Sequence, residues 1–176
     1  LRKVYFVAKF DKPIQQSVFV NGKRIFSGAN LINGNAAKAA FRFNTNKNNT
    51  VQMKVALSAT SIEDAYKNMT AELPDWNFEK TVANAKFAWN KALAVIDAEG
   101  TTEQKQIFYT GLYRNFIQPN NLANADGTYS GTDFTTHKAT DGTHYSTFSL
   151  WDTYRATHPL YTLTAPQKDA AFINSM

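Results

Sequence analysis

The sequence contains no cysteine, so disulfide bonds and thiolate metal sites cannot contribute to its structure or chemistry. It also has no apolar run near the roughly 20 residues that a membrane-spanning helix requires, which predicts no membrane span. Its formal net charge is +5, but the lysines and arginines are scattered and form no basic run. This charge pattern predicts that nucleic acid is not a partner.

What is present indicates a packed protein. Hydrophobic residues make up 43% and aromatic residues 14% of the 176 positions, which is typical of a folded chain rather than a disordered one. The first residue is Leu1 and a strand pattern starts at once, while the last residues, 164–176, read as a helix that is cut short. We therefore expect an internal piece of a longer protein, with the remainder of its own polypeptide as a partner.

The first sixty residues have the period of β-strands. Apolar residues at Val4, Phe6, Ala8 and Phe10 alternate with their neighbours, which predicts a strand with this face buried. The dipeptide Asn21-Gly22 lies between two apolar runs and predicts a hairpin turn. Two further alternating runs cover 36–44 and 51–57. Together they predict about five antiparallel strands, enough for one sheet of a β-sandwich.

At Ser61 the period changes to that of helices. Ser61 stands three residues before Asp64, a variant of the capping box, and predicts a short helix that Pro74 ends. An apolar seam over 78–96 predicts a longer helix, packed in a core and ended by Gly100.

A second capping box, Thr101 with Gln104, predicts the start of the next helix, which runs to Pro119. Residues 120–143 read as a long loop. A helix that includes Trp151 is expected to stop before Pro159, and a last helix is expected to follow, capped by Thr164 with Pro166 in its first turn.

Most candidate sites in the sequence have a structural interpretation. Residues 124–133 have a faint likeness to a calcium loop, but Leu122 stands where the first ligand should be, so Asp126-Gly127 predicts a turn instead. The three histidines, at 137, 144 and 158, lack the spacing of metal ligands. No motif of a known nucleophile or phosphate-binding loop occurs.

The stretch from Tyr145 to Leu160 brings three unusual residues together. On a helix, Trp151, Asp152 and Arg155 would lie on one face, because they are separated by three and four positions. One interpretation is an ion pair between Asp152 and Arg155 that packs on a core tryptophan. The other is a sugar site, in which the indole stacks on a pyranose while the charged groups bind its hydroxyls.

Four blocks of sequence resemble the α-1,2-mannosidases of glycoside hydrolase family 92. They are "SIEDAYKNMTAELPDWNFEKTVANAKFAWNKAL", "GTTEQKQIFYTGLYRNFIQPN", "DGTYSG" and "FSLWDTYRATHPLYTL", and they run in family order from about Ser61 to Leu163. The strand region before Ser61 matches the family only in its general pattern of strands, without a distinctive block of residues. One departure is Arg114, where the family commonly has histidine.

The resemblance implies an α+β chain with three parts. Residues 1–60 would belong to an N-terminal antiparallel β-sandwich, residues 61–100 to a helical linker, and residues 101–176 to the start of an (α/α)6 barrel. The parent protein would be a calcium-dependent, inverting exo-α-mannosidase acting on mannose-containing glycans, and it would be periplasmic, cell-surface or secreted.

The resemblance also assigns roles within the chain. The catalytic acid and base and the calcium ligands would lie outside it, so the chain alone would be inactive and would hold no metal. Trp151, Asp152 and Arg155 would bind substrate. Two other functions remain open: a non-catalytic carbohydrate-binding β-sandwich module, and a structural connector between domains.

Overall fold

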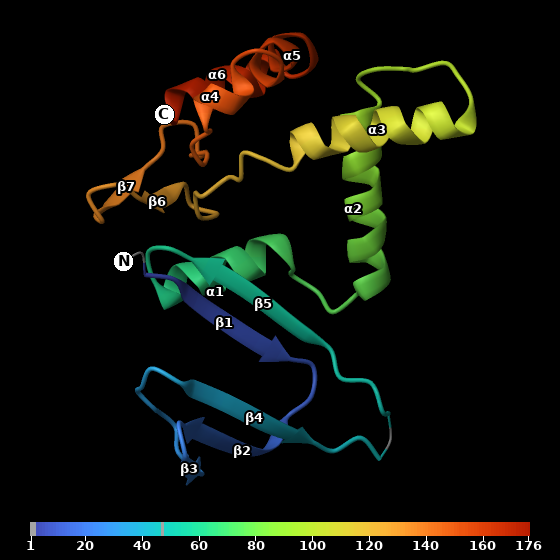
Figure 1. Ribbon diagram of the computed structural model, residues 1–176. Coiled ribbons are helices and arrows are strands. Elements are labelled where there is room, and N and C mark those ends of the chain that lie inside the picture. Colours follow the sequence, from blue (N-terminus) through green and yellow to red (C-terminus); the bar gives the residue numbers. More distant parts are fainter. Residues whose placement is uncertain (1–2, 47) are drawn as a thin grey trace. The chain divides into compact units, whose positions relative to one another are not determined.

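The computed structural model describes residues 3–46 and 48–176. In the described residues, five strands are followed by three helices, a short hairpin and three more helices, and Figure 1 shows this order by colour along the chain. The chain divides into two compact units, one of Val7–Ala56 and one of Leu57–Met176 with the residues before Val7. Antiparallel strands followed by helices confirm the predicted α+β class.

A three-stranded antiparallel sheet forms much of the Val7–Ala56 unit. Its central strand, β2 (Ile14–Asn21), pairs with β3 (Arg24–Ser27) on one side and with β4 (Ala37–Phe43) on the other. The predicted hairpin is confirmed, one residue later than expected. Asn21 pairs with Arg24, so Gly22 and Lys23 form the loop, and Gly22 has the positive φ of +60° that such tight turns require.

A separate two-stranded sheet contains β1 (Tyr5–Phe10) and β5 (Met53–Ser58). The five predicted strands are therefore present, but in two sheets rather than one. The predicted buried face of β1 is wrong, because Phe6 is 65% exposed and Val7 only 6%. Apolar side chains occupy both faces of this strand, so alternation alone could not identify the buried one.

Two capped helices follow the strands. Helix α1 (Ile62–Glu72) begins at Ser61, whose hydroxyl accepts a hydrogen bond from the Asp64 amide at 2.9 Å, as predicted. Helix α2 (Phe78–Leu93) begins at Asn77 and ends seven residues before Gly100. The expected end at Gly100 is therefore wrong.

Helix α3 (Thr102–Phe116) begins with the predicted capping box of Thr101 and Gln104. Its Tyr109 hydroxyl donates to the Ile96 carbonyl at 3.0 Å and accepts from the Ala98 amide at 3.3 Å. These two bonds satisfy backbone groups that further turns of α2 would otherwise satisfy, which explains why α2 ends early. Trp89 of α2 packs on Tyr113 of α3, with ring centroids 4.5 Å apart.

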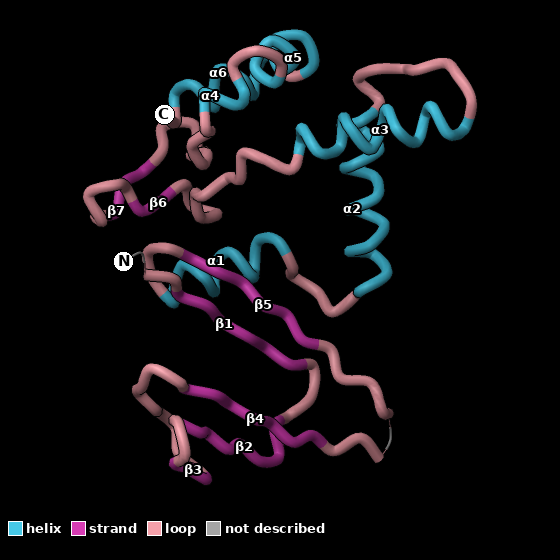
Figure 2. The backbone as a smooth tube through the Cα atoms, viewed as in Figure 1, coloured by secondary structure: helices cyan, strands magenta, loops and turns pink. Residues whose placement is uncertain are grey.

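Residues 120–143, predicted as loop, contain a short hairpin. Strands β6 (Thr128–Ser130) and β7 (Thr136–Lys138) pair antiparallel and interrupt the loop that Figure 2 draws between α3 and α4. The predicted Asp126-Gly127 turn leads into β6, and Gly127 has a φ of +82°. Strands of three residues are too short for alternation to reveal them.

A buried polar cluster fixes this hairpin to the rest of its unit. The Asn124 side-chain oxygen accepts from the Ser58 hydroxyl and from the Asn68 amide nitrogen, each at 2.9 Å. Its amide nitrogen donates to the hydroxyls of Thr60 at 2.7 Å and Thr128 at 2.9 Å. Asn124 is only 5% exposed, so four hydrogen bonds satisfy a side chain that burial would otherwise destabilise.

The chain ends in three helices, α4 (Leu150–Thr153), α5 (Thr157–Thr164) and α6 (Pro166–Asn174). Tyr161 and Phe172, with exposed fractions of 1% and 6%, pack edge to face at 5.4 Å between α5 and α6. Phe148 completes this aromatic cluster, since its ring lies 5.8 Å from Phe172.

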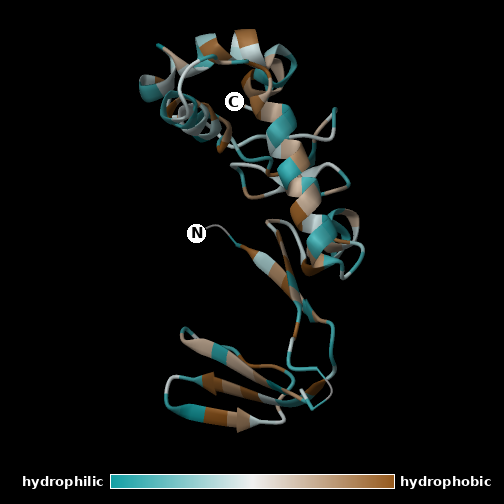
Figure 3. Ribbon diagram, turned by 90° about the vertical axis from the view of Figure 1, so that its right-hand side faces the viewer, coloured by the Kyte–Doolittle hydropathy of each residue, from teal (hydrophilic) through white to brown (hydrophobic). Residues whose placement is uncertain are grey.

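Hydrophobic and hydrophilic residues are interleaved along the helices and strands (Figure 3). No helix in the described part of the chain is both long and apolar enough to cross a membrane.

Candidate functional site

The segment that carries Trp151 is two short helices rather than one. Helix α4 ends at Thr153, a turn covers residues 154–156, and α5 then includes Pro159 in its first turn. The prediction of one helix ending before Pro159 is therefore wrong, since proline is tolerated where the helix amides have no intrahelical acceptor. Thr164 is not a cap: it is the last residue of α5, and its hydroxyl donates to the Leu160 carbonyl at 2.9 Å.

Trp151 and Arg155 come together despite the break in the helix. The guanidinium carbon of Arg155 lies 6.0 Å from the centroid of the Trp151 ring and 5.2 Å from that of Tyr154. Its Nε donates to the Tyr154 hydroxyl at 2.6 Å. Trp151 is 77% exposed in this chain. The three side chains form an aromatic–cationic surface, defined here as Trp151, Tyr154 and Arg155.

Asp152 lies next to this surface and is exposed. In the described residues it forms no ion pair with Arg155, whose guanidinium contacts the two aromatic rings instead. The alternative of an ion pair on a core tryptophan is therefore not the arrangement of this chain. The carboxylate of Asp152 remains an acceptor with space around it.

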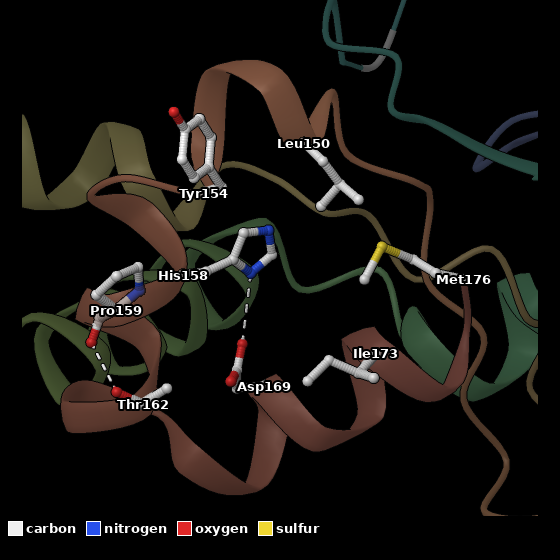
Figure 4. A pocket seen from close by; sticks show the side chains of 8 residues that line it. All are labelled: Leu150, Tyr154, His158, Pro159, Thr162, Asp169, Ile173 and Met176. Atoms are coloured by element: carbon white, nitrogen blue, oxygen red, sulfur yellow. Dashed lines mark hydrogen bonds and ion pairs between the residues drawn. The ribbon is translucent and has the colours of Figure 1, made fainter.

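A pocket of about 570 Å³ opens beside the same segment (Figure 4). Eight residues from α4, the following turn, α5, α6 and the last residue line it: Leu150, Tyr154, His158, Pro159, Thr162, Asp169, Ile173 and Met176. Tyr154 belongs both to this pocket and to the aromatic–cationic surface. The two features therefore share a wall, whereas Trp151, Asp152 and Arg155 lie outside the pocket lining.

The pocket lining contains a histidine and a carboxylate that face each other, His158 and Asp169. His158 Nδ1 lies 3.6 Å from Asp169 Oδ1, an interaction that is ionic when the imidazole is protonated. Asp169 is 7% exposed, and neither Asp169 Oδ1 nor His158 Nε2 has a hydrogen-bond partner in the described part of the chain. Burial, and to a lesser extent Asp169, raise the pKa of the nearby Tyr161 hydroxyl.

Three aspartates on the 120–143 segment are held in turns with a threonine two residues later. Asp126 accepts from the hydroxyl and the amide of Thr128, which lowers the pKa of this carboxyl strongly. Asp133 accepts from the amide and hydroxyl of Thr135 and contacts His137, which lowers its pKa to about 2.

The amide and the hydroxyl of Thr143 lower the pKa of Asp141 in the same way. A general acid needs a raised pKa, so these carboxyls are poorly suited to donate a proton at neutral pH.

The residues that the structure describes contain no group of three or more histidine, aspartate or glutamate side chains placed to hold a metal ion. Calcium binds six to eight oxygens and carboxylates are usual among them, and the described residues bring no such group of carboxylates together. The described residues do not fit the calcium ion that the resemblance implies.

Sequence reasoning missed three residues of this region, Tyr154, His158 and Asp169. Tyr154 lies in the stretch from Tyr145 to Leu160, and its position next to Arg155 in the sequence is the signal that could have found it. His158 and Asp169 lie on two different helices, α5 and α6, so the periodicity of one helix does not connect them.

Comparison with known proteins places the chain in a class of enzymes. The model of the glycosyl hydrolase family 92 N-terminal domain matches residues 1–58, and the model of the family's catalytic domain matches residues 64–176. These matches define the class as glycosyl hydrolases built from an N-terminal domain and a catalytic domain. The chain belongs to glycosyl hydrolase family 92.

Two solved structures have the same fold as this chain. A family GH92 alpha-mannosidase from Bacteroides thetaiotaomicron is 32% identical with a TM-score of 0.86, and the alignment covers 99% of this chain and 24% of that one. The same enzyme has also been solved in complex with mannoimidazole. A family GH92 inverting mannosidase from Bacteroides thetaiotaomicron VPI-5482 is 27% identical with a TM-score of 0.83, over 98% of this chain and 24% of that one.

A curated relative, an uncharacterized secreted glycosidase from Arthroderma benhamiae, is 32% identical over 84 residues. That alignment covers 45% of this chain and 11% of the relative. The chain spans about a quarter of the length of the solved mannosidases that it matches.

Proposed function

We propose that this chain is part of an inverting exo-α-mannosidase that removes terminal mannose, with a preference for α-1,2 linkages, from glycans. The observation that carries the proposal is the family 92 match over residues 1–58 and 64–176, together with 32% identity to an alpha-mannosidase. A complex of that relative with mannoimidazole supports mannose as the recognised sugar.

In this proposal, Trp151, Asp152 and Arg155 bind the terminal mannose. An exposed indole can stack on the apolar face of a pyranose, and a carboxylate and a guanidinium can bind adjacent hydroxyls with charge-assisted hydrogen bonds. The geometry supports this assignment, because Trp151 is exposed, Arg155 lies beside it and, in the described residues, the Asp152 carboxylate forms no ion pair with Arg155. Tyr154 orients Arg155, because its hydroxyl accepts a hydrogen bond from Arg155 Nε.

The proton-transfer groups are proposed to lie outside residues 1–176. Inversion requires an acid and a base roughly 6.5–9.5 Å apart, with water between the base and the sugar. Asp126, Asp133 and Asp141 have lowered pKa values, which makes them unsuitable as the acid. Calcium, which is proposed to bind outside this chain as well, would act by polarising substrate oxygens. We therefore expect the isolated chain to be inactive.

The division at residues 60 and 100 stays a prediction. In it, residues 1–60 belong to a β-sandwich, residues 61–100 are a helical linker and residues 101–176 begin an (α/α)6 barrel.

The test is Asp152→Asn in the full-length enzyme that contains this chain. The change keeps the shape of the side chain but replaces a charged acceptor with a neutral one. A charge-assisted hydrogen bond contributes about 1.5–3 kcal/mol, so kcat/KM for an α-mannoside should fall about ten- to over a hundredfold. Asp97→Asn, at an exposed carboxylate after α2, is the matched control and should leave kcat/KM unchanged.

Two results would reject the assignment. If Asp152→Asn is inactive and azide or formate restores turnover, then Asp152 is a catalytic carboxylate rather than a sugar ligand. If Asp152→Asn has the same kcat/KM as Asp97→Asn, then Asp152 does not contact the mannose.

A further inference from the structure

The side chains of His158 and Asp169 are largely buried, and a buried charge without a partner is destabilising. The Asp169 side chain is 10% exposed and that of His158 is 18% exposed. The His158 ring packs on Phe148 at 4.7 Å with an interplanar angle of 70°. A buried carboxylate oxygen without a hydrogen bond is strongly destabilising unless an opposite charge is near. The imidazole 3.6 Å away is the group that can provide that charge.

The pair connects the two helices that follow the proposed sugar-binding residues. His158 lies in the first turn of α5, three residues after Arg155, and Asp169 lies in the first turn of α6. The first turn of a helix also favours a carboxylate, because its amide dipoles point toward the negative charge. The contact therefore fixes the start of α5, which is the point where the turn carrying Tyr154 and Arg155 ends.

The same pair shares a pocket with Tyr154, a residue of the aromatic–cationic surface. Tyr154, His158 and Asp169 line one cavity, in which Figure 4 shows the Tyr154 ring above His158 and Asp169 below it. Tyr154 in turn contacts Arg155 through its ring and its hydroxyl. His158 follows Tyr154 by four residues, and the turn of residues 154–156 leads directly into α5. A shift of His158 at the start of α5 would therefore displace this turn, and with it Tyr154 and the guanidinium of Arg155.

We propose that His158 and Asp169 are positioning residues, whose buried contact holds Tyr154 and thereby aims Arg155 at the mannose. This proposal rests on the proposed function, since Arg155 must bind sugar for its position to matter. His158 and Asp169 themselves do not touch the substrate. Their effect is on sugar affinity, and it passes through Arg155.

The experiment is a mutant cycle in the full-length enzyme with an aryl α-mannoside as substrate. His158→Phe keeps a ring against Phe148 but removes both nitrogens. We expect KM to rise about tenfold with little change in kcat, below the hundredfold that a misplacement of about 1 Å can cost. In an Arg155→Ala background the same change should raise KM less than about twofold, because the two residues act in one chain of contacts.

Two further variants keep the test decisive if His158→Phe does not fold. Asp169→Asn retains the Oδ1 acceptor and removes the charge, so KM should rise by a smaller factor, about threefold, which is also lost in the Arg155→Ala background. His158→Gln, which keeps a side-chain N–H but cannot carry a charge, should give a KM between those of the wild type and His158→Phe. His137→Phe, at an exposed histidine of β7, is the control and should leave KM unchanged.

The results separate this inference from the function on which it rests. If His158→Phe or Asp169→Asn raises KM by the same factor with and without Arg155, or leaves it unchanged, the positioning role is wrong although the sugar site stands. If Trp151→Ala and Arg155→Ala themselves leave KM for the mannoside unchanged, the sugar site is wrong and the positioning role falls with it.

Discussion

Replacing Asn124 by aspartate should open the 120–143 segment, although the two side chains have nearly the same shape. The orientation of the Asn124 amide is fixed by its neighbours. The Ala125 amide donates to Asn68 Oδ1 at 2.8 Å, so Asn68 Nδ2 must be the donor to Asn124. Asn124 Oδ1 is therefore the acceptor, and its Nδ2 faces the hydroxyls of Thr60 and Thr128.

Those two hydroxyls cannot donate to a carboxylate in return. The Thr60 hydroxyl already donates to Asp64 at 2.7 Å, and the Thr128 hydroxyl to Asp126 at 2.6 Å. The Asn124→Asp change would place an oxygen against both, lose two hydrogen bonds and bury a charge near two other carboxylates. Two lost bonds at about 1 kcal/mol each, with a further 1 kcal/mol or more for the unsatisfied groups, give a destabilisation of at least about 3 kcal/mol.

Hydrogen exchange measured by mass spectrometry on the full-length protein would show this effect locally. The amides of Asn124, Ala125 and Gly127 are all hydrogen-bonded within the cluster. A local destabilisation of about 3 kcal/mol should speed their exchange by about 150-fold. The control is Asn121→Asp, because the exposed Asn121 uses its Oδ1 to accept from the Ala123 and His144 amides, and a carboxylate accepts equally well. Equal exchange in the two variants would refute the reasoning.

Two other changes test the same part of the fold. A hydrogen bond from Lys67 is the main reason that the pKa of Asp64 lies below the ordinary 3.8. The pKa of Asp126 is lowered mainly by hydrogen bonds from Thr128, with a further one from Lys67. The two carboxylates therefore stabilise the folded state fully above pH 3.8, and this stabilisation is lost as the pH falls below that value. The fall in melting temperature between pH 7 and pH 3 should therefore be smaller in Lys67→Met, and a fall as large as in the wild type would contradict this. Gly127→Ala should lower the free energy of unfolding by about 1–2 kcal/mol, because φ is +82° and the new Cβ would lie 3.2 Å from a backbone atom. The control Gly111→Ala, within helix α3, should raise the free energy of unfolding by about 0.5–1 kcal/mol. Thermal unfolding measures both changes, and an unchanged stability of Gly127→Ala would show that the turn can relax.

Local signals in the sequence predicted the starts of α1 and α3 and the existence of the first five strands. The caps at Ser61 and Thr101 act through amides three residues away, so the sequence contains all of their partners. The turn at Gly22 is equally local. Helix ends were harder to predict, because the backbone just beyond α2 is bonded by Tyr109, thirteen residues after Ile96.

The candidate site could be predicted only in part, because some of its contacts join residues that are distant in the sequence. The spacing of Trp151 and Arg155 indicated that they would meet, and they do, although the helix assumed to join them is broken. Of the two interpretations of Arg155, the ion pair with Asp152 is not the arrangement of this chain, because the guanidinium lies near the Tyr154 ring instead. The pairing of His158 with Asp169 depends on how α5 packs on α6, which no short motif encodes.

The buried position of Asn68 has a consequence for how the protein can be produced. Asn68-Met69-Thr70 has the sequence of an acceptor for N-linked glycosylation, and the glycan would be attached to the side-chain nitrogen. That nitrogen donates to the Leu57 carbonyl and to Asn124, both at 2.9 Å, and the residue is 9% exposed. A eukaryotic secretory host that glycosylates the chain before it folds would thus block the cluster around Asn124, while a bacterial host without this modification leaves Asn68 free to fold into place.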